Sequence, residues 1–377
     1  MSNVTSKKLF TPGPLGCTRT VKEAMLRDVG SRDAEMIDVI RDIREELLDV
    51  AGVSSKEYTA VLMQGSGTFC VEAVFQTACP RQGARVLLMI NGAYGKRMKT
   101  ICDRLGIAAD CCEFREDEMV DPLKVEEQLR AGGGDYCLAA AVHCETSSGV
   151  VNPVGELGRL VAERLPGALY LVDAMSSLGA VPLDAAAARA DFVVSSANKC
   201  LQGVPGFSFV LARRGPLRRC EGNSRSLSLD LAQQAEGLDA LGQFRFTPPT
   251  HALLAFRQAL REFQLEGGVP ARARRYRENW RILQEGMSAM GFRKLLSGKG
   301  EGYIISTYHF PRHRNFSFDH FYASLSEMGQ VIYPGKVTQA DCFRIGNIGD
   351  LHPQDMAHLL RCIEEVLARM AVPVPVP

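Results

Sequence analysis

Short, almost uninterrupted apolar segments alternate with helical stretches through the first 250 residues. They read RVLLMI (85–90), CLAAAV (137–142), LYLV (169–172), DFVV (191–194) and FSFVL (207–211). Strands that are apolar on both sides suit a sheet covered by helices on both faces, and such sheets are mostly parallel. Residues 34–50 supply one covering helix, because apolar residues such as Met36, Ile40 and Ile43 recur there at helical spacing. We therefore predict an α/β fold with a mostly parallel central sheet.

The pattern changes near residue 250. A charged helical stretch over 252–290 is interrupted near Gly267-Gly268, and shorter elements follow it. We expect strands at 303–309, 330–333 and 342–345, and helices at 319–328 and 356–370. The sequence thus predicts an N-terminal arm (1–20), a large domain (21–265), a smaller C-terminal α+β domain (266–370) and an extended Pro/Val tail (371–377).

Charge and apolar runs exclude several classes of partner. Lys and Arg number 44 against 43 for Asp and Glu, so we expect neither nucleic acid nor a membrane surface as a partner. No apolar run reaches the roughly 18 residues of a membrane span, and no secretory signal is present at the start. The twelve cysteines form no CxxC pair, which favours reduced thiols and a cytoplasmic location. We predict no metal site, since Pro311 separates His309 from His313.

Polar residues that could carry chemistry follow the predicted strands. The segment Gln64-Gly65-Ser66-Gly67-Thr68 opens a helix-like stretch, where free N–H groups and hydroxyls can bind an anion. An ordinary glycine turn is the alternative for this segment. Asp173 follows a buried strand, where a carboxylate needs a cationic partner, although it could equally cap a helix. Ligands of such sheets bind beyond the carboxyl ends of the strands.

Two cationic side chains stand in equally unusual places. Lys199 follows the strand DFVV, where burial would lower the pKa of its amine and suit it to imine chemistry; a surface lysine is the alternative. Arg344 lies within an apolar strand and could form an internal ion pair or clamp an anionic ligand.

One cofactor requires this combination of groups. Pyridoxal 5′-phosphate condenses with a lysine through its aldehyde, pairs its ring nitrogen with an acid and binds its phosphate at a helix start. Tyr94, after the strand RVLLMI, could stack on the ring. The four features together therefore predict a pyridoxal-phosphate site.

The chain resembles the class V, fold-type I pyridoxal-phosphate aminotransferases from about Leu9 to Met370. The stretches that carry the resemblance are TPGPL (11–15), QGSGT (64–68), NGAYG (91–95), HCET (143–146), VDAMSS (172–177), SSANKCLQGVPGF (195–207), SRSLSLD (224–230), RFTPPTH (245–251), VIYPGK (331–336) and FRIGNIG (343–349). Several of these are long and unusual in composition. The resemblance implies that the large domain binds the cofactor.

The resemblance also implies individual roles. Lys199 would hold the cofactor covalently and Asp173 would pair with its ring nitrogen. The residues implied near the rest of the cofactor are Ser66, Gly67 and Thr68 at the phosphate, with Asn198 close by, Tyr94 on the ring and Thr146 near the ring hydroxyl. Thr247 would reach the phosphate of a neighbouring subunit, which implies a homodimer.

The implied reaction moves the amino group of 2-aminoethylphosphonate to pyruvate. Arg344 would hold the acidic group of either substrate, and Gly13 and Arg32 would lie near it. The segment Gly30-Ser31-Arg32-Asp33 departs from the family, in which a tryptophan often stands at the position of Arg32. A surface position is the other interpretation of this arginine. The alternatives for the whole chain are a class V enzyme acting on alanine, serine or glyoxylate, and a cofactor-binding regulator without activity.

Overall fold

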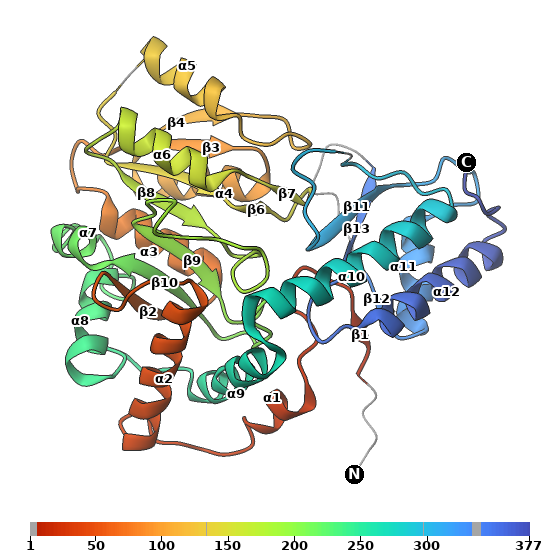
Figure 1. The fold of residues 1–377 in the computed structure, drawn as a ribbon, viewed down its shortest axis with the longest axis horizontal. Helices are drawn as coiled ribbons and strands as arrows, with labels where there is room; N and C mark the ends of the chain where they lie inside the picture. The colour runs from red at the N-terminus through yellow and green to blue at the C-terminus, as the bar shows by residue number, and fades with distance from the viewer. Residues whose placement is uncertain (1–5, 133, 297, 334–340) are drawn as a thin grey trace.

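A seven-stranded sheet forms the centre of the larger part of the molecule (Figure 1). The computed structural model describes residues 6–132, 134–296, 298–333 and 341–377. The strand order is β2-β10-β9-β8-β5-β3-β4. The bounds are Tyr58–Gln64 (β2), Arg85–Ile90 (β3), Ala108–Glu113 (β4), Leu138–Val142 (β5), Leu169–Asp173 (β8), Phe192–Ser196 (β9) and Phe207–Arg213 (β10). All the strands predicted before residue 250 are present, each within two residues of its expected bounds.

Every strand of this sheet except β10 runs in the same direction. β10 is antiparallel to both of its neighbours, β2 and β9, whereas the other paired strands are parallel. The connection between β9 and β10, residues 197–206, is short and contains no helix. Parallel neighbours need a crossover of a dozen or more residues, so this connection makes β10 reverse. The predicted mostly parallel α/β sheet is confirmed, with one reversed strand.

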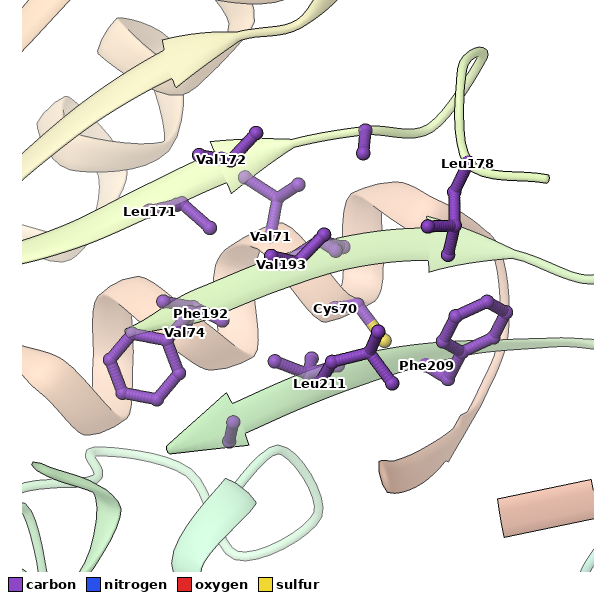
Figure 2. Packing of buried hydrophobic residues seen from close by; sticks show 14 of the residues in the cluster. Cys70, Val71, Val74, Leu171, Val172, Leu178, Phe192, Val193, Phe209 and Leu211 are labelled. Atoms are coloured by element: carbon purple, nitrogen blue, oxygen red, sulfur yellow. The ribbon is translucent and has the colours of Figure 1, made fainter. Parts of the chain in front are cut away.

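Helix α3 (Gly67–Ala78) packs on the sheet over β8, β9 and β10. Cys70, Val71 and Val74 of the helix lie close to apolar side chains of these strands, among them Phe192 and Val193 (Figure 2). The helix is apolar around most of its circumference because α4 and α8 flank it as well. The other helices of this part are α1 (Arg19–Glu23), α2 (Ala34–Val50), α4 (Ala93–Leu105), α5 (Pro122–Gly132), α6 (Val154–Arg164), α7 (Arg214–Arg219), α8 (Leu231–Leu241) and α9 (Thr250–Glu266).

Helix α2 has the bounds that its apolar spacing predicted. Asp33 caps it by accepting a hydrogen bond from the N–H of Glu35, 2.9 Å away. Met36, Ile40 and Ile43 are fully buried against the rest of the large core, and charged residues cover the outer face. The apolar residues whose spacing predicted the helix are therefore the ones that the structure buries.

A second hydrophobic core lies at the other end of the molecule. It is built by β11 (Ile305–His309), β13 (Cys342–Gly346), β12 (Gln330–Val331), α11 (Phe318–Glu327), α12 (Pro353–Arg369) and the end of α10 (Gly268–Ala289). In Figure 1 these elements lie together on the side where the C-terminus is marked. The predicted 303–309 strand begins two residues later than expected, and the predicted 330–333 strand is shorter. The remaining short strands are β6 (Cys144–Glu145) and β7 (Val150–Val151).

Residues 8–10 of the N-terminal arm belong to this second core, whereas Leu15 and Cys17 of the arm pack in the large core. β1 (Lys8–Leu9) pairs in parallel with β12, and Phe10 is fully buried among the apolar residues of the small domain. The N–H of Phe10 donates to the carbonyl of Val331 at 2.8 Å, and its own carbonyl accepts from Gly346 at 2.9 Å. The described chain thus passes from the second core at Phe10 to the large core at Leu15.

Helix α10 connects the two cores. Tyr276 on its first half packs in the large core, whereas Leu283 and Met287 on its second half pack in the small one. The domain boundary at 265/266 stays a prediction; it lies one residue before the end of α9, and the buried residues of α10 divide between the two cores. The Pro/Val tail also packs: Val376 is 7% exposed, and its N–H donates to the carbonyl of Met290 at 2.8 Å.

Among the described helices, none combines the length and the apolar composition that crossing a membrane requires.

Replacing Phe10 with alanine should destabilise the small domain. The side chain is fully buried, and removing a buried phenyl ring usually costs about 3–5 kcal/mol. Leu26→Ala is the control, because Leu26 is 83% exposed. Urea unfolding followed by circular dichroism should show a lower midpoint for Phe10→Ala alone. Equal midpoints for the two variants would mean that the arm does not complete the core.

Candidate active site

The carboxyl ends of five like-directed strands meet around one cavity of about 410 Å³. Segments that follow β2, β3, β8 and β9 line it, and the segment after β5 lies at its edge. The lining residues are Gly13, Pro14, Gly65, Ser66, Gly67, Thr68, Val71, Tyr94, Arg97, Met98, Asp173, Met175, Ser196, Asn198, Lys199, Pro205 and Gly206. The structure therefore brings together most of the residues that the sequence singled out, as expected for strand ends of a doubly wound sheet.

Asp173 is the last residue of β8 and lines the cavity. One carboxylate oxygen accepts a hydrogen bond from the N–H of Met175 at 2.9 Å. Burial raises the pKa of Asp173 to about 6, although the Met175 N–H and the positive charges of Lys199 and Arg97 oppose the increase. The described residues offer this carboxylate no ion pair, so its charge lacks a close cationic partner.

The backbone of His143 is hydrogen-bonded to that of Asp173. The backbone N–H of His143 donates to the carbonyl of Asp173 at 2.8 Å, and the ring Nδ1 shares a hydrogen bond with Ser177 Oγ at 2.9 Å. Burial lowers the pKa of His143 to about 4, so the ring is neutral. His143 is therefore a buried, hydrogen-bonded residue.

Lys199 lies in the connection between β9 and β10 and is 9% exposed. Burial lowers the pKa of its amine, while the Cys200 thiol and Asp173 oppose that shift. Gly13 packs directly on this side chain: a Cβ at Gly13 would lie 2.7 Å from Lys199 Cδ. The lysine is therefore held in place by the N-terminal arm and favours the neutral amine more than a surface lysine does.

The segment predicted as an anion cradle, residues 64–68, lies at the start of α3. Ser66 is the N-cap of the helix, yet its hydroxyl makes no capping hydrogen bond, so it can serve a ligand. The first N–H groups of a helix have no partner inside the helix and point toward its start. Asn198 lines the same cavity. These groups suit a phosphate.

Tyr94 and Thr146 meet at the edge of the cavity. The N–H of Tyr94 donates to Glu145 Oε2 at 3.2 Å, which anchors the first turn of α4. Thr146 is buried, and its hydroxyl shares a hydrogen bond with Ser176 at 3.0 Å. Burial raises the pKa of Tyr94, and a hydrogen bond with Thr146 opposes this.

Arg344 reaches the same edge from β13 in the small domain. One guanidinium nitrogen donates to the carbonyl of Thr146 at 2.9 Å, and the guanidinium lies 4.5 Å from the ring centroid of Tyr333. The side chain is buried, yet its Nε has no hydrogen-bond partner among the described residues. Burial lowers the pKa of Arg344, which indicates a cation that is only partly compensated. A buried donor without a partner is rare and suits an anionic ligand.

Two predicted residues lie away from this cavity. Arg32 is exposed in the turn before α2, and Thr247 is exposed in the segment that precedes α9. Neither lines the cavity of its own chain. Their suggested roles, for Arg32 near the substrate and for Thr247 in a neighbouring subunit, stay predictions. Residues 334–336 of the VIYPGK stretch lie outside the described part of the chain.

Two residues of the site had not been singled out from the sequence. Arg97 lines the cavity and donates to the hydroxyl of Thr68 at 3.3 Å. Glu145 is fully buried and accepts from the N–H groups of Tyr94 and Ser147. Arg97 lies one helical turn after Tyr94, a spacing that could have indicated it. Glu145 lay within the matching stretch HCET, but its role as an anchor depends on contacts that spacing does not reveal.

The groups around the cavity fit pyridoxal 5′-phosphate. The cradle suits the phosphate, the carboxylate of Asp173 lacks a cation that a protonated ring nitrogen would supply, and Lys199 is a buried amine. The fold and the site together define a pyridoxal-phosphate-dependent enzyme of fold type I.

Comparison with known proteins narrows this class. Residues 19–332 match the model of the family "Aminotransferase class-V". A 2-aminoethylphosphonate–pyruvate transaminase of Bacteroides fragilis is 46% identical over 95% of this chain and 98% of its own, and one of Syntrophobacter fumaroxidans is 47% identical over 96% of each. An alanine–glyoxylate aminotransferase structure from Nostoc has a TM-score of 0.88 at 25% identity, covering 97% of this chain and 96% of that one. The chain belongs to the class-V aminotransferases and is a pyridoxal-phosphate-dependent transaminase.

Replacing Gly13 with alanine should displace Lys199. The added Cβ would overlap the lysine side chain, and a displacement of about 1 Å can cost about 100-fold in rate. Gly298→Ala is a matched control, because Gly298 has a φ of 112° against 114° at Gly13 but no atom within 4 Å of an added Cβ. We expect Gly13→Ala alone to lose most of its transaminase kcat, measured by alanine release. Equal losses in both variants would assign the effect to backbone strain.

Asp173→Asn should stabilise the cofactor-free protein at high pH. The raised pKa means that the folded state holds the proton more tightly than the unfolded state, so this group loses stability as pH rises from about 4 to about 6. Above that window the ionised carboxylate costs on the order of 2–3 kcal/mol, which asparagine avoids. Urea unfolding of the apoprotein should show a higher midpoint for the variant than for the wild type at pH 8, with a smaller difference at pH 5. A difference independent of pH would contradict this account.

Proposed function

We propose that this transaminase moves the amino group of 2-aminoethylphosphonate to pyruvate, giving phosphonoacetaldehyde and L-alanine. The observation that carries the proposal is the buried guanidinium of Arg344, whose Nε has no partner among the described residues. A phosphonate and a carboxylate are both small anions that such a group can bind. The names of the relatives that are 46% and 47% identical support the same pair of substrates.

The cofactor would be held by the residues that the sequence indicated. Ser66, Gly67 and Thr68 would bind its phosphate, Asn198 would lie nearby and Tyr94 would cover the ring. Thr146 would lie near the ring hydroxyl. When bound, pyridoxal phosphate supplies an aldehyde that condenses with amines and a ring that withdraws electrons.

The protein's own part of the reaction is to move protons and hold charges. Lys199, once released from the cofactor, would take the proton from the carbon that bears the amino group, a task for which its lowered pKa suits it. Asp173 would keep a proton on the ring nitrogen by stabilising its positive charge. Because both residues are buried, water competes little with these interactions.

Arg344 would serve both half-reactions. The donor would place its phosphonate, and the acceptor its carboxylate, against the same guanidinium, and Gly13 would border the space in which they bind. Since the two substrates use one site in turn, the enzyme should follow ping-pong kinetics. Arg32 could add positive charge for the phosphonate only if a conformational change or a second subunit brings it near.

The active unit is proposed to be a homodimer in the cytoplasm. Phe69, Leu227 and Phe246 are 50%, 72% and 45% exposed, and Phe69 and Phe246 border an apolar cavity of about 310 Å³ next to the phosphate cradle. Large exposed apolar groups of this kind suit a subunit interface. Thr247 follows Phe246 directly and would enter the neighbouring site from there.

An amino-donor screen tests the proposal. Holoenzyme is incubated with pyruvate and one donor at a time, and alanine is measured. We expect turnover with 2-aminoethylphosphonate and little with serine. Transfer from alanine to glyoxylate without any turnover of the phosphonate would overturn the proposal in favour of an alanine–glyoxylate enzyme.

Arg344→Ala should weaken the binding of both substrates. Loss of a charge-assisted bidentate contact usually costs on the order of 2–5 kcal/mol, so KM should rise by at least about 30-fold for each. Arg361→Ala is the control, because this arginine is exposed on α12. Steady-state kinetics with each substrate varied in turn gives both values. An unchanged KM for both substrates would remove Arg344 from its role.

A further inference from the structure

Arg97 lines the cavity and carries a positive charge, but the proposed reaction gives it no role. It lies on α4, one turn after Tyr94, and its guanidinium is 4.8 Å from the centroid of the Tyr94 ring. One of its nitrogens donates to the hydroxyl of Thr68 at 3.3 Å. Arg97 thus contacts both the side chain that would cover the ring and a side chain of the phosphate cradle.

No carboxylate forms an ion pair with Arg97 in the described part of the chain. Other arginines at strand ends do pair, such as Arg85 with Asp110 at 2.6 Å and Arg213 with Asp191 at 3.1 Å. Arg97 is an exposed residue whose guanidinium lies against a hydroxyl and an aromatic ring, and neither of these groups neutralises its charge. The cavity beside it is where an anion would bind.

The hydrogen bond from Arg97 leaves the proton of the Thr68 hydroxyl available. When the Thr68 oxygen accepts from Arg97, its own O–H is free to donate in another direction. Thr68 lines the cavity, so a phosphate bound there could accept this hydrogen bond. The same guanidinium restrains the Tyr94 ring through a cation–π contact, which is usually worth about 0.5–2 kcal/mol.

We propose that Arg97 is a positioning residue that orients the Thr68 hydroxyl toward the phosphate of the cofactor and fixes the Tyr94 ring over the cofactor plane. This role rests on the proposed use of the cavity for pyridoxal phosphate. It makes phosphate recognition depend on α4 as well as on the start of α3. A plain structural link between the two helices is the competing account.

Binding measurements on the apoprotein separate these accounts. Pyridoxal 5′-phosphate and pyridoxal, which lacks the phosphate, are each titrated into the wild type and Arg97→Met, with protein fluorescence or absorbance as the readout. We expect Arg97→Met to weaken binding of the phosphorylated form by about tenfold, the size of one charge-assisted hydrogen bond, and to affect pyridoxal much less. Arg97→Lys, which keeps the charge, should recover part of the loss.

A double-mutant cycle with Thr68→Val tests the route of the effect. If Arg97 acts through the Thr68 hydroxyl, Arg97→Met should cost much less in the Thr68→Val background. Arg104→Met is the matched control, since Arg104 is exposed on the same helix and does not line the cavity. Thermal unfolding of each apoprotein checks that the variants fold.

Two outcomes would overturn the proposal. Equal losses for pyridoxal and its phosphate would assign Arg97 a structural role, and additive effects in the cycle would exclude action through Thr68. These results do not depend on the amino donor. A wild type that binds the cofactor but does not use 2-aminoethylphosphonate would refute the proposed substrates while leaving this test intact.

Discussion

Two buried charges, the carboxylate of Asp173 and the amine of Lys199, are the constraint around which the site is organised. Asp173 is the last residue of β8 and Lys199 follows the end of β9, and these two strands are neighbours in the sheet. Burial raises the pKa of the first and lowers the pKa of the second, so each charged form is destabilised in the free protein. A ligand that brings a positive ring nitrogen and an aldehyde relieves both penalties, and this couples cofactor binding to stability.

The two hydrophobic cores place groups from distant parts of the chain around those charges. Gly13 reaches Lys199 because the arm passes from the small core to the large one. Arg344 reaches Thr146 because β13 directs it out of the small domain. The site therefore combines groups that the large core positions with Arg344, which β13 of the second core positions.

Local patterns predicted the elements whose regularly spaced apolar residues are also the ones that the structure buries. The helix at 34–50 and the strand at 85–90 were predicted with their observed bounds, because one apolar face or one apolar run was sufficient. The edge strand β4 (Ala108–Glu113) was not predicted: it reads AADCCE and is half-buried, so it lacks an apolar run. The strand β2 (Tyr58–Gln64) was not predicted either, although it is buried and its segment AVLM (60–63) is an apolar run like those of the predicted strands.

The sequence by itself determined the alternation of strands and helices, the residues at the strand ends and, through its motifs, the family. These features depend on the type and spacing of residues that are neighbours in the chain, so they can be recognised in the sequence alone. Only the tertiary structure decided which of those residues meet, that Arg97 and Glu145 join them, and that Arg32 lies outside the cavity of its own chain. The physical reason is that burial and hydrogen bonding act between segments far apart in the chain, so no local pattern records them.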